Sequence, residues 1–227
     1  MTENANKLAV KHFGILVFTG FQALDAFGPL DILNTLALKR SISLSIIAST
    51  LDPVSTKPPS NALQLPLGSD FAQSIVPTHT FADPPEDLDV LIIPGGFGAH
   101  TSTPETLAAI AFIKDVFPKL GHLFTVCTGS SLAARAGVLD GRNATSNKSF
   151  FEMVKKEGPN VKWVPHARWV RDDNVWTTSG VSAGLDGMFA FVATHWGEDV
   201  AEDLAKTLEY ERHTDPSWDP FAEIYGL

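Results

Sequence analysis

Cysteine is almost absent from this chain of 227 residues, which contains one, Cys127. A single cysteine excludes a disulfide within the chain, a zinc site built from several cysteines and a Cys-x-x-Cys redox motif. Two interpretations of the thiol remain: an inert side chain that fills space in the core, or a reactive group with a chemical role. The sequence around Cys127 has to decide between them.

Basic residues and long apolar runs are also scarce. The chain has 17 Lys and Arg against 26 Asp and Glu, for a formal net charge of −9. It therefore has no general electrostatic attraction for nucleic acids or anionic membranes. No apolar run approaches the ~18 residues of a membrane-spanning helix, and the polar start lacks the features of a secretory signal. We expect a cytoplasmic protein that binds neither nucleic acid nor membrane.

Short apolar runs alternate with longer segments of helical periodicity. Runs of strand length cover 12–18, 41–49, 89–93 and 122–126, with strand-like pieces over 161–178. Helical spacing covers 29–38, 104–119, 129–136, 149–156, 182–196 and 198–212. Segment 52–82, rich in Pro, Ser and Thr, predicts short excursions over the surface. The alternation predicts one α/β domain over 1–227, with a mostly parallel sheet covered by helices on both faces and irregular ends at 1–8 and about 214–227.

Cys127 follows an apolar strand and directly precedes a helical segment, in FTVCTGSSLAARAG. A thiol at a helix N-terminus feels the positive end of the helix dipole, which favours the thiolate. A turn from strand to helix also places its side chain at the rim of the sheet, where open α/β folds bind ligands. The next glycine, Gly129, allows a close approach of backbone. This context favours a reactive thiol over an inert core residue.

A second turn of this kind follows the strand in VLIIPGGFGAH. Consecutive glycines such as Gly95 and Gly96 free backbone N–H groups to face an anion or oxyanion. An ordinary tight turn is the alternative interpretation. The segment is neither a P-loop nor a dinucleotide-binding fingerprint, because it lacks Gly-Lys-Ser/Thr and the Gly-x-Gly-x-x-Gly spacing.

Two aspartates lie near the first strand, in GFQALDAFGPLDIL. Asp25 stands among apolar residues, a setting that can raise the pKa of its carboxyl group, and function and structure explain it about equally well. Asp31 falls in the first turn of the helix predicted over 29–38, where a carboxylate is favoured without any function.

Histidine gives little support for a metal site or an adjacent Cys–His pair. None of the seven adjoins Cys127, and no pair shows the spacing of a zinc site, so a metal is not expected. A Cys–His dyad built from distant segments stays possible. His195 lies in an apolar helix and is interpreted as a packing residue. The seven are His12, His79, His100, His122, His166, His195 and His213.

Several segments, in this order, resemble the DJ-1/PfpI superfamily and, within it, the isonitrile (isocyanide) hydratase-like branch. They are LDAFGPLDIL, LIIPGGFG, TVCTGSSLAARAGVLDGRNAT, TTSGVSAGLDGMF and LEY, and they span about residues 10–212. The resemblance implies a flavodoxin-like α/β sandwich, commonly a homodimer. Ser146-Asn147-Lys148 departs from the branch, which typically has Thr-His-Trp there, and the chain stops without the longer C-terminal helix of many relatives.

The resemblance also implies roles for individual residues. Cys127 matches the nucleophile, and Thr128 the residue after it, whose backbone N–H helps to hold developing negative charge. Gly96 matches the other amide donor, and Asp25 the acid that lies over the sulfur and moves protons. Thr128 stands where many relatives have histidine, which counts against a glyoxalase or peptidase.

By the same resemblance, the segment TTSGVSAGLDGMF is expected to supply Gly180 and Val181 as substrate-binding residues. Val181 and Phe27 are expected to form walls of the pocket.

The activity implied is a hydro-lyase that adds water to an isonitrile, R–N≡C, and forms an N-formamide through a thioimidate on Cys127. The substrate is a small molecule, and this chemistry requires neither a metal nor an organic cofactor. Two alternatives stay open: a glyoxalase- or deglycase-like activity on reactive carbonyls, and a non-catalytic, redox-sensing role through oxidation of Cys127.

Overall fold

A seven-stranded sheet forms the centre of the computed structural model, which describes residues 10–60, 62 and 69–227. The strand order is β10-β11-β7-β6-β1-β2-β5, and all neighbours pair in parallel except β10 and β11. The bounds are β1 His12–Leu16, β2 Ser43–Ala48, β5 His79–Thr80, β6 Val90–Ile93, β7 His122–Thr125, β10 Trp169–Asp172 and β11 Val175–Thr178. The predicted α/β fold with a mostly parallel sheet is confirmed.

Two further strand pairs lie outside this sheet. Strands β3 (Val54–Ser55) and β4 (Ser74–Ile75) pair antiparallel within the segment predicted to run over the surface. Strands β8 (Asn143–Ala144) and β9 (Lys162–Trp163) pair in parallel beside α4. Each strand has two residues, so these pairs shape loops and add little to the core.

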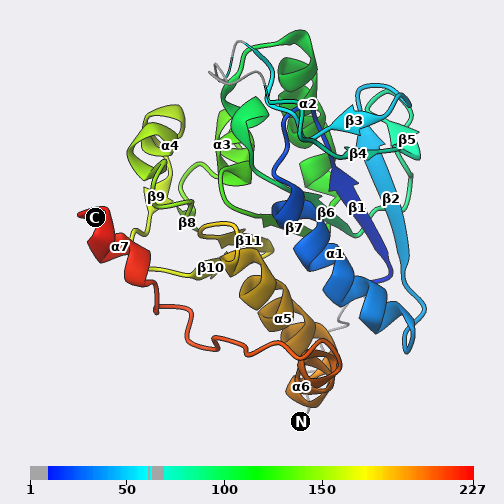
Figure 1. The fold of residues 1–227 in the computed structure, drawn as a ribbon, viewed down its shortest axis with the longest axis vertical. Coiled ribbons are helices and arrows are strands. Elements are labelled where there is room, and N and C mark those ends of the chain that lie inside the picture. The colour runs from blue at the N-terminus through cyan, green and yellow to red at the C-terminus, as the bar shows by residue number, and fades with distance from the viewer. Residues whose placement is uncertain (1–9, 61, 63–68) are drawn as a thin grey trace.

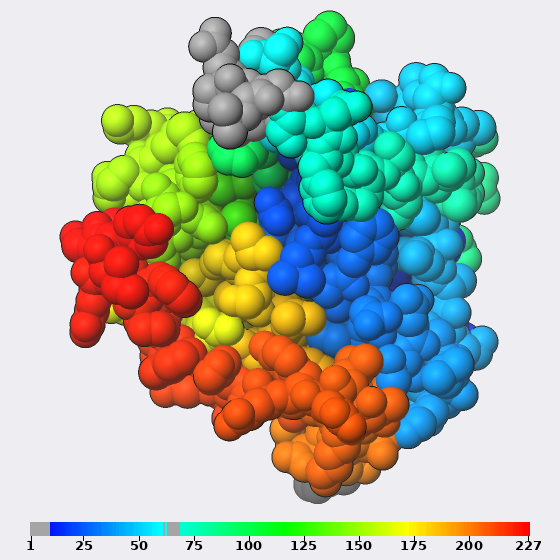
Figure 2. Space-filling view, viewed as in Figure 1, coloured from blue at the N-terminus to red at the C-terminus, as the bar shows by residue number. Residues whose placement is uncertain are grey.

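Helices cover both faces of the sheet (Figure 1). Helices α1 (Ala23–Ala37), α5 (Ala183–Trp196) and α6 (Glu198–Thr207) pack together, as do α2 (Pro104–Val116), α3 (Gly129–Arg135) and α4 (Phe151–Glu157). Short 3₁₀ turns, η1 (Phe97–His100) and η2 (Phe117–Lys119), flank α2, and α7 (Pro220–Ile224) lies near the C-terminus. Figure 2 shows the blue α1 and the gold α5 side by side at the surface, with the orange and red tail below and beside them.

Both faces of the central strands are buried, because helices cover the two faces of the sheet. Every residue of β6, VLII, is buried, and so is every residue of β11. A strand covered on both faces reads as a continuous apolar run rather than an alternating one. Aromatic rings fill the space between sheet and helices, with Phe13, Phe124 and Phe191 fully buried and in edge-on contact.

The chain changes direction across the sheet at β1, which pairs with β2 on one side and β6 on the other. In open α/β sheets ligands bind where the order reverses, beyond the carboxyl ends of the strands. The turns after β6 and β7, which carry Gly96 and Cys127, meet the first turn of α1, which carries Asp25, at this place. The topology therefore brings together residues that lie about a hundred positions apart.

Several expectations at the ends of elements were wrong, among them the end of α6, which stops at Thr207 rather than at residue 212. Helix α1 begins at Ala23 rather than at residue 29, and it contains Pro29 in its second turn. Proline removes one helical hydrogen bond, but the helix buries Ala26, Leu30 and other apolar side chains, and this burial compensates. Asp31 consequently lies in the third turn, too far from the helix N-terminus for the helix dipole to stabilise its carboxylate as expected.

The tail is also more regular than expected, because α7 forms within 214–227 after Asp219 caps it by accepting a hydrogen bond from the Phe221 N–H. The irregular start predicted over 1–8 lies outside the described residues. Among the described helices, none has both the length and the apolar character needed to cross a bilayer.

Candidate active site

Cys127 lies on a strained turn between β7 and α3. Its φ of 55° is in the left-handed region, which a side chain with a Cβ adopts only at a cost of about 1–3 kcal/mol. The hydroxyls of Ser130 and Ser146 both donate to the Cys127 carbonyl at 3.1 Å and hold the turn. A Cβ at Gly129 would lie 2.1 Å from the Ile93 carbonyl oxygen, so only glycine allows this close approach. The predicted strand-to-helix turn is confirmed.

Asp25 is fully buried next to the Cys127 sulfur. One carboxyl oxygen, Oδ2, accepts a hydrogen bond of 2.9 Å from the Gly95 backbone N–H. The other, Oδ1, is buried and accepts no hydrogen bond from the described residues. Burial raises the pKa of Asp25 from 3.8 to about 7, although the Gly95 amide and the Cys127 thiol both oppose the rise. The raised pKa expected from its apolar neighbours is supported.

Burial also raises the pKa of the Cys127 thiol, which is 6% exposed, and negative charge on Asp25 raises it further. The Thr128 backbone amide, the Asn147 amide and the Thr128 hydroxyl lower it, but by less. The expectation that the helix N-terminus favours the thiolate was therefore wrong in its direction. Desolvation and a neighbouring carboxylate outweigh the dipole of a helix only seven residues long. The thiol and the carboxyl group form one proton-holding pair.

Asn147 makes the direct side-chain contact to the sulfur. Its Nδ2 donates to Sγ over 3.2 Å. The assignment of nitrogen and oxygen in this amide is fixed by its other side, because Oδ1 accepts from the Ser149 N–H, the Ser149 hydroxyl and the Phe150 N–H. The sequence marked this position only as a departure from the branch. An amide here donates a hydrogen bond and cannot carry a proton.

Lys148 anchors the segment that carries Asn147. Its buried ammonium group donates to the Thr145 hydroxyl at 2.7 Å and to the Ala167 carbonyl at 2.9 Å, and it lies 3.4 Å from Asp219. Burial lowers the pKa of Lys148 to about 8, against the opposing effect of Asp219. The group is therefore cationic at neutral pH, and it ties this loop to the C-terminal tail.

Thr128 and Gly96 interact with each other at the mouth of the turn. The Gly96 N–H donates to the Thr128 hydroxyl over 3.1 Å, so this amide is already engaged and does not face the sulfur unpaired. Gly96 has a φ of 131°, and a Cβ there would lie 2.3 Å from the Gly20 carbonyl oxygen. Of the two amides expected to hold negative charge, the Thr128 amide contacts the sulfur.

A small pocket of about 140 Å³ opens over the thiol. Val181 lines it, as expected, together with residues that the sequence did not suggest, including His100, Phe97 and Phe150. The full lining is Gln22, Gly96, Phe97, His100, Cys127, Thr128, Asn147, Phe150 and Val181. Gly180 does not line the pocket and instead lies against Asn147, whose Nδ2 would be 3.5 Å from an added Cβ.

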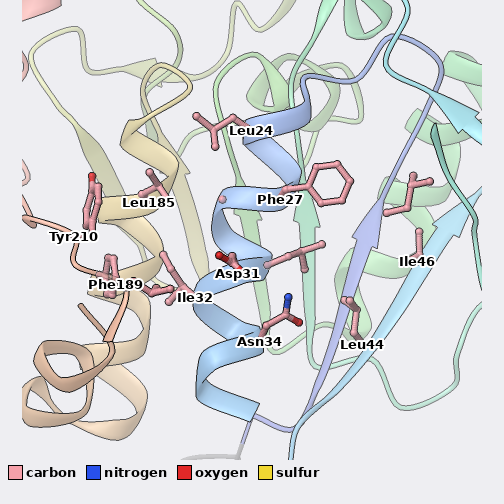
Figure 3. A pocket seen from close by; sticks show the side chains of 14 residues that line it. Leu24, Phe27, Asp31, Ile32, Asn34, Leu44, Ile46, Leu185, Phe189 and Tyr210 are labelled. Atoms are coloured by element: carbon pink, nitrogen blue, oxygen red, sulfur yellow. The ribbon is translucent and has the colours of Figure 1, made fainter. Parts of the chain in front are cut away.

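Phe27 belongs to a different hollow, so its expected place in the wall was wrong. Because α1 begins at Ala23, Phe27 faces away from the thiol and is 40% exposed. It lines an open, apolar groove of about 550 Å³ along α1. Figure 3 shows the side chains of α1 projecting toward β2 on one side and toward α5 and Tyr210 on the other. We call this the α1 groove, and it contains no cysteine.

No group of three or more His, Cys, Asp or Glu side chains able to hold a metal ion occurs in the part of the chain that the structure describes.

Comparison with known proteins agrees with this geometry. Residues 11–194 match the DJ-1/PfpI family. The chain belongs to the DJ-1/PfpI family. The resemblance in the sequence is thereby confirmed, and the mostly parallel sheet with helices on both faces is the flavodoxin-like fold expected of this family.

Three similar proteins show how varied the family is. An isonitrile hydratase from Pseudomonas putida is 32% identical over 87% of this chain and 77% of its own. A THiJ/PfpI family protein from Pseudomonas syringae, known by its crystal structure, is 32% identical, with a TM-score of 0.71 over 96% of this chain and 83% of its own. The transcriptional regulator GbdR from Pseudomonas aeruginosa is 28% identical over 55% of this chain and 33% of its own. Both an enzyme and a regulator therefore have this kind of domain.

Proposed function

We propose that this protein is a hydro-lyase that adds water to an isonitrile and releases the N-formamide. The observation that carries the proposal is the proton-holding pair: the Cys127 thiol and the buried Asp25 carboxyl group, with Asn147 donating to the sulfur. The similarity to the isonitrile hydratase of Pseudomonas putida supports it. The same pair can perform nucleophilic attack and proton transfer without a metal or an organic cofactor.

The first half of the reaction forms a thioimidate. The Cys127 sulfur attacks the terminal carbon of R–N≡C, and the thiol proton passes to the Asp25 carboxylate. Asp25 then delivers this proton to the same carbon, whose lone pair becomes the new C–H bond. The product is R–N=CH–S–Cys127, and Asp25 is left ionised. The Asn147 and Thr128 donors stabilise negative charge on the sulfur as its proton leaves.

The second half releases the formamide. The Asp25 carboxylate takes a proton from water as the water oxygen attacks the thioimidate carbon. The C–S bond breaks with its electron pair returning to sulfur, and the second water proton moves from the new hydroxyl to the nitrogen, which gives R–NH–CHO. Cys127 and Asp25 then share one proton again. The acid and base roles of Asp25 therefore alternate between the two halves.

The dimensions and lining of the pocket fit this class of substrate. About 140 Å³ accommodates a slim molecule, and Phe97, Phe150 and Val181 provide apolar walls. Among the described residues no Lys or Arg side chain lines the pocket, so none supplies a permanent positive charge for an anionic substrate. Isonitriles are neutral and narrow, in agreement with both properties.

Formamide formation from an alkyl isonitrile, followed by chromatography and mass spectrometry, tests the proposal. We expect turnover by the wild-type protein, none by Cys127→Ala, and a rate at least about 100-fold lower for Asp25→Asn, the size typical of a lost acid–base group. Asp115→Asn is the control, because Asp115 is exposed on α2 and lines neither the Cys127 pocket nor the α1 groove. Full turnover by Cys127→Ala would show that the reaction does not proceed through the thioimidate.

The same preparations separate the alternatives. Lactate formed from methylglyoxal would indicate a glyoxalase- or deglycase-like activity, with a hemithioacetal on Cys127. A gain of 32 Da, the mass of two oxygen atoms, after mild peroxide would indicate the redox-sensing role through a sulfinate. The raised pKa of Cys127 means that Asp25 must take the thiol proton before oxidation as well, because the thiolate is the form that attacks peroxide.

We further propose that the protein is a homodimer that buries the α1 groove against a second copy. Leu24, Phe27 and Leu44 are at least 40% exposed and all line this groove, an arrangement that favours association. Sedimentation velocity is expected to give a dimer for the wild type and a monomer for Phe27→Glu. A wild-type monomer at micromolar concentration would contradict this assignment.

A further inference from the structure

His100 lines the Cys127 pocket from the side of the PGG turn, and the mechanism above gives it no role. It ends the 3₁₀ turn η1, and 13% of its side chain is exposed. Both ring nitrogens are buried: Nε2 has no hydrogen-bond partner among the described residues, and Nδ1 has only an ion-pair contact, at 3.5 Å from Glu157 Oε2. Leaving buried polar atoms unpaired costs about 1–3 kcal/mol each. The buried ring of His100 is therefore available to bind a polar group of a substrate in the Cys127 pocket.

Three separate contacts fix the position of this ring. It stacks on Phe150 with ring centres 5.7 Å apart and an interplanar angle of 15°. The Arg135 guanidinium donates to the carbonyls on either side of His100, to Ala99 at 2.7 Å and to Thr101 at 3.0 Å. Arg135 belongs to α3, the helix that begins directly after the Cys127 turn. The same short helix therefore places both the nucleophile and the histidine.

A carboxylate lies behind the ring. His100 Nδ1 is 3.5 Å from Glu157 Oε2, and the Ser131 hydroxyl, also on α3, donates to the same oxygen. Burial of Glu157 raises the pKa of its carboxyl group, but the interactions with His100 and Ser131 outweigh this and hold it below the ordinary value. Glu157 is therefore ionised at neutral pH and would stabilise a positive charge on the ring. Enzymes with an activated nucleophile commonly have a histidine near it and a carboxylate that orients the histidine, and Cys127, His100 and Glu157 are residues of these three types.

The second half of the proposed reaction needs a proton carrier of this kind. Two protons leave the water molecule, and they end on different atoms. Asp25 takes the first as water attacks the thioimidate carbon. The second must leave the new hydroxyl as the carbonyl forms, and a proton must reach the nitrogen, on the side of the substrate away from the sulfur. Asp25 already holds the first proton beside the sulfur, and His100 is the other titratable side chain in the lining of the pocket besides Cys127.

We propose that His100 carries this second proton from the hydroxyl oxygen to the substrate nitrogen, and that Glu157 and Ser131 are positioning residues for it. The neutral imidazole takes the hydroxyl proton and becomes a cation, which the Glu157 carboxylate stabilises. The cation then gives a proton to the nitrogen, the carbonyl forms, and the C–S bond breaks with its electrons returning to sulfur. The ring is neutral again at the end. This assignment rests on the proposed hydratase activity and adds a second acid–base group to it.

The experiment measures the two halves of the reaction, formation of the thioimidate and release of the formamide, separately. Wild type, His100→Gln and the control His166→Gln are mixed with an alkyl isonitrile; formamide is measured by chromatography, and the adduct on Cys127 by intact mass. His166 lies away from the pocket, where its ring bonds the Leu227 carbonyl oxygen at 2.8 Å. We expect His100→Gln to form the adduct at a rate within about threefold of wild type but to release formamide roughly 100-fold more slowly, so that the adduct accumulates. His166→Gln is expected to behave as wild type.

Glu157→Gln tests the positioning role and serves if His100→Gln does not fold. It is expected to lower kcat about tenfold with KM unchanged and to accumulate the adduct, whereas a purely structural defect would lower the melting temperature and raise KM. Release of formamide by both variants at the wild-type rate, without adduct, would overturn the role of His100 and leave the hydratase activity intact. A wild-type protein that forms no formamide would refute the hydratase activity and the role of His100 together.

Discussion

Replacing Asp25 with asparagine is expected to remove a pH dependence from the stability of the folded protein. Asparagine has nearly the same shape, can still accept from the Gly95 N–H, and stays neutral at every pH. The wild-type carboxyl group is instead forced by burial to hold its proton up to a pH of about 7. A comparison of the two proteins therefore isolates the free energy of ionising one buried group.

The sign follows from proton binding. Between pH 3.8 and about 7 the folded state holds the Asp25 proton and the unfolded state does not, so the stability of the wild type falls as pH rises. Each pH unit in this window is worth about 1.4 kcal/mol, which gives roughly 4 kcal/mol over the whole window. Roughly 2.5 kcal/mol of it falls between pH 5 and 8, a range accessible to experiment. Above pH 8 the difference stays constant.

Urea unfolding followed by tryptophan fluorescence measures this difference. The free energy of unfolding is determined for wild type and Asp25→Asn at several pH values from 5 to 8. Subtracting the two curves removes the contribution of every other titrating group. We expect the wild type to lose roughly 2.5 kcal/mol relative to the variant across this range.

Activity should change in the opposite direction. Because the ionised carboxylate must accept the thiol proton, kcat/KM of the wild type is expected to rise as pH increases through about 7. The same group would thus lower stability and raise activity over one pH interval. Parallel stability curves for the two proteins would refute the argument, since they would mean that the buried carboxyl group titrates as in water.

Three further changes test other parts of the site. Gly96→Ala should cost at least about 2 kcal/mol in urea unfolding, because its Cβ would strike a backbone carbonyl, whereas Gly137→Ala, also at positive φ but in open space, should cost about 1 kcal/mol. Asn147→Ala should lower formamide formation about tenfold, since it removes a donor to the sulfur, and should also lower the melting temperature, since Oδ1 no longer accepts from Ser149 and Phe150. Lys148→Met should cost about 3 kcal/mol in unfolding and expose the tail to trypsin, because Asp219 would be left buried without its cation; Lys148→Met as stable as wild type would contradict this.

The sequence predicted the parts of the site that lie at the ends of strands. Cys127 and the PGG turn both follow apolar runs, and parallel strands end at one edge of a sheet, so their meeting could be inferred. The raised pKa of Asp25 also followed from its apolar neighbours. The fold class was predictable for the same reason, because alternation of strands and helices is a property of the sequence itself.

The remaining residues depend on packing between distant segments. Nothing in the sequence near His100 shows that it lines the same pocket as Cys127, because the place of its ring depends on Arg135 and on the ring of Phe150. Phe27 was misplaced for a related reason. Phe27 was predicted to precede the helix. Because α1 begins six residues earlier, at Ala23, Phe27 is part of the helix and its side chain lines the α1 groove.

The left-handed backbone at Cys127 has a consequence for every substitution made there. The strain belongs to the backbone and a Cβ, so serine and alanine inherit it, and loss of activity in those variants reports the missing sulfur rather than a relaxed turn. Only glycine would release it, but Cys127→Gly would at the same time lose the buried thiol and give the unfolded backbone more freedom, which offsets the relief of strain. Cys127→Ala is therefore the variant that separates the loss of the sulfur from a change in the backbone.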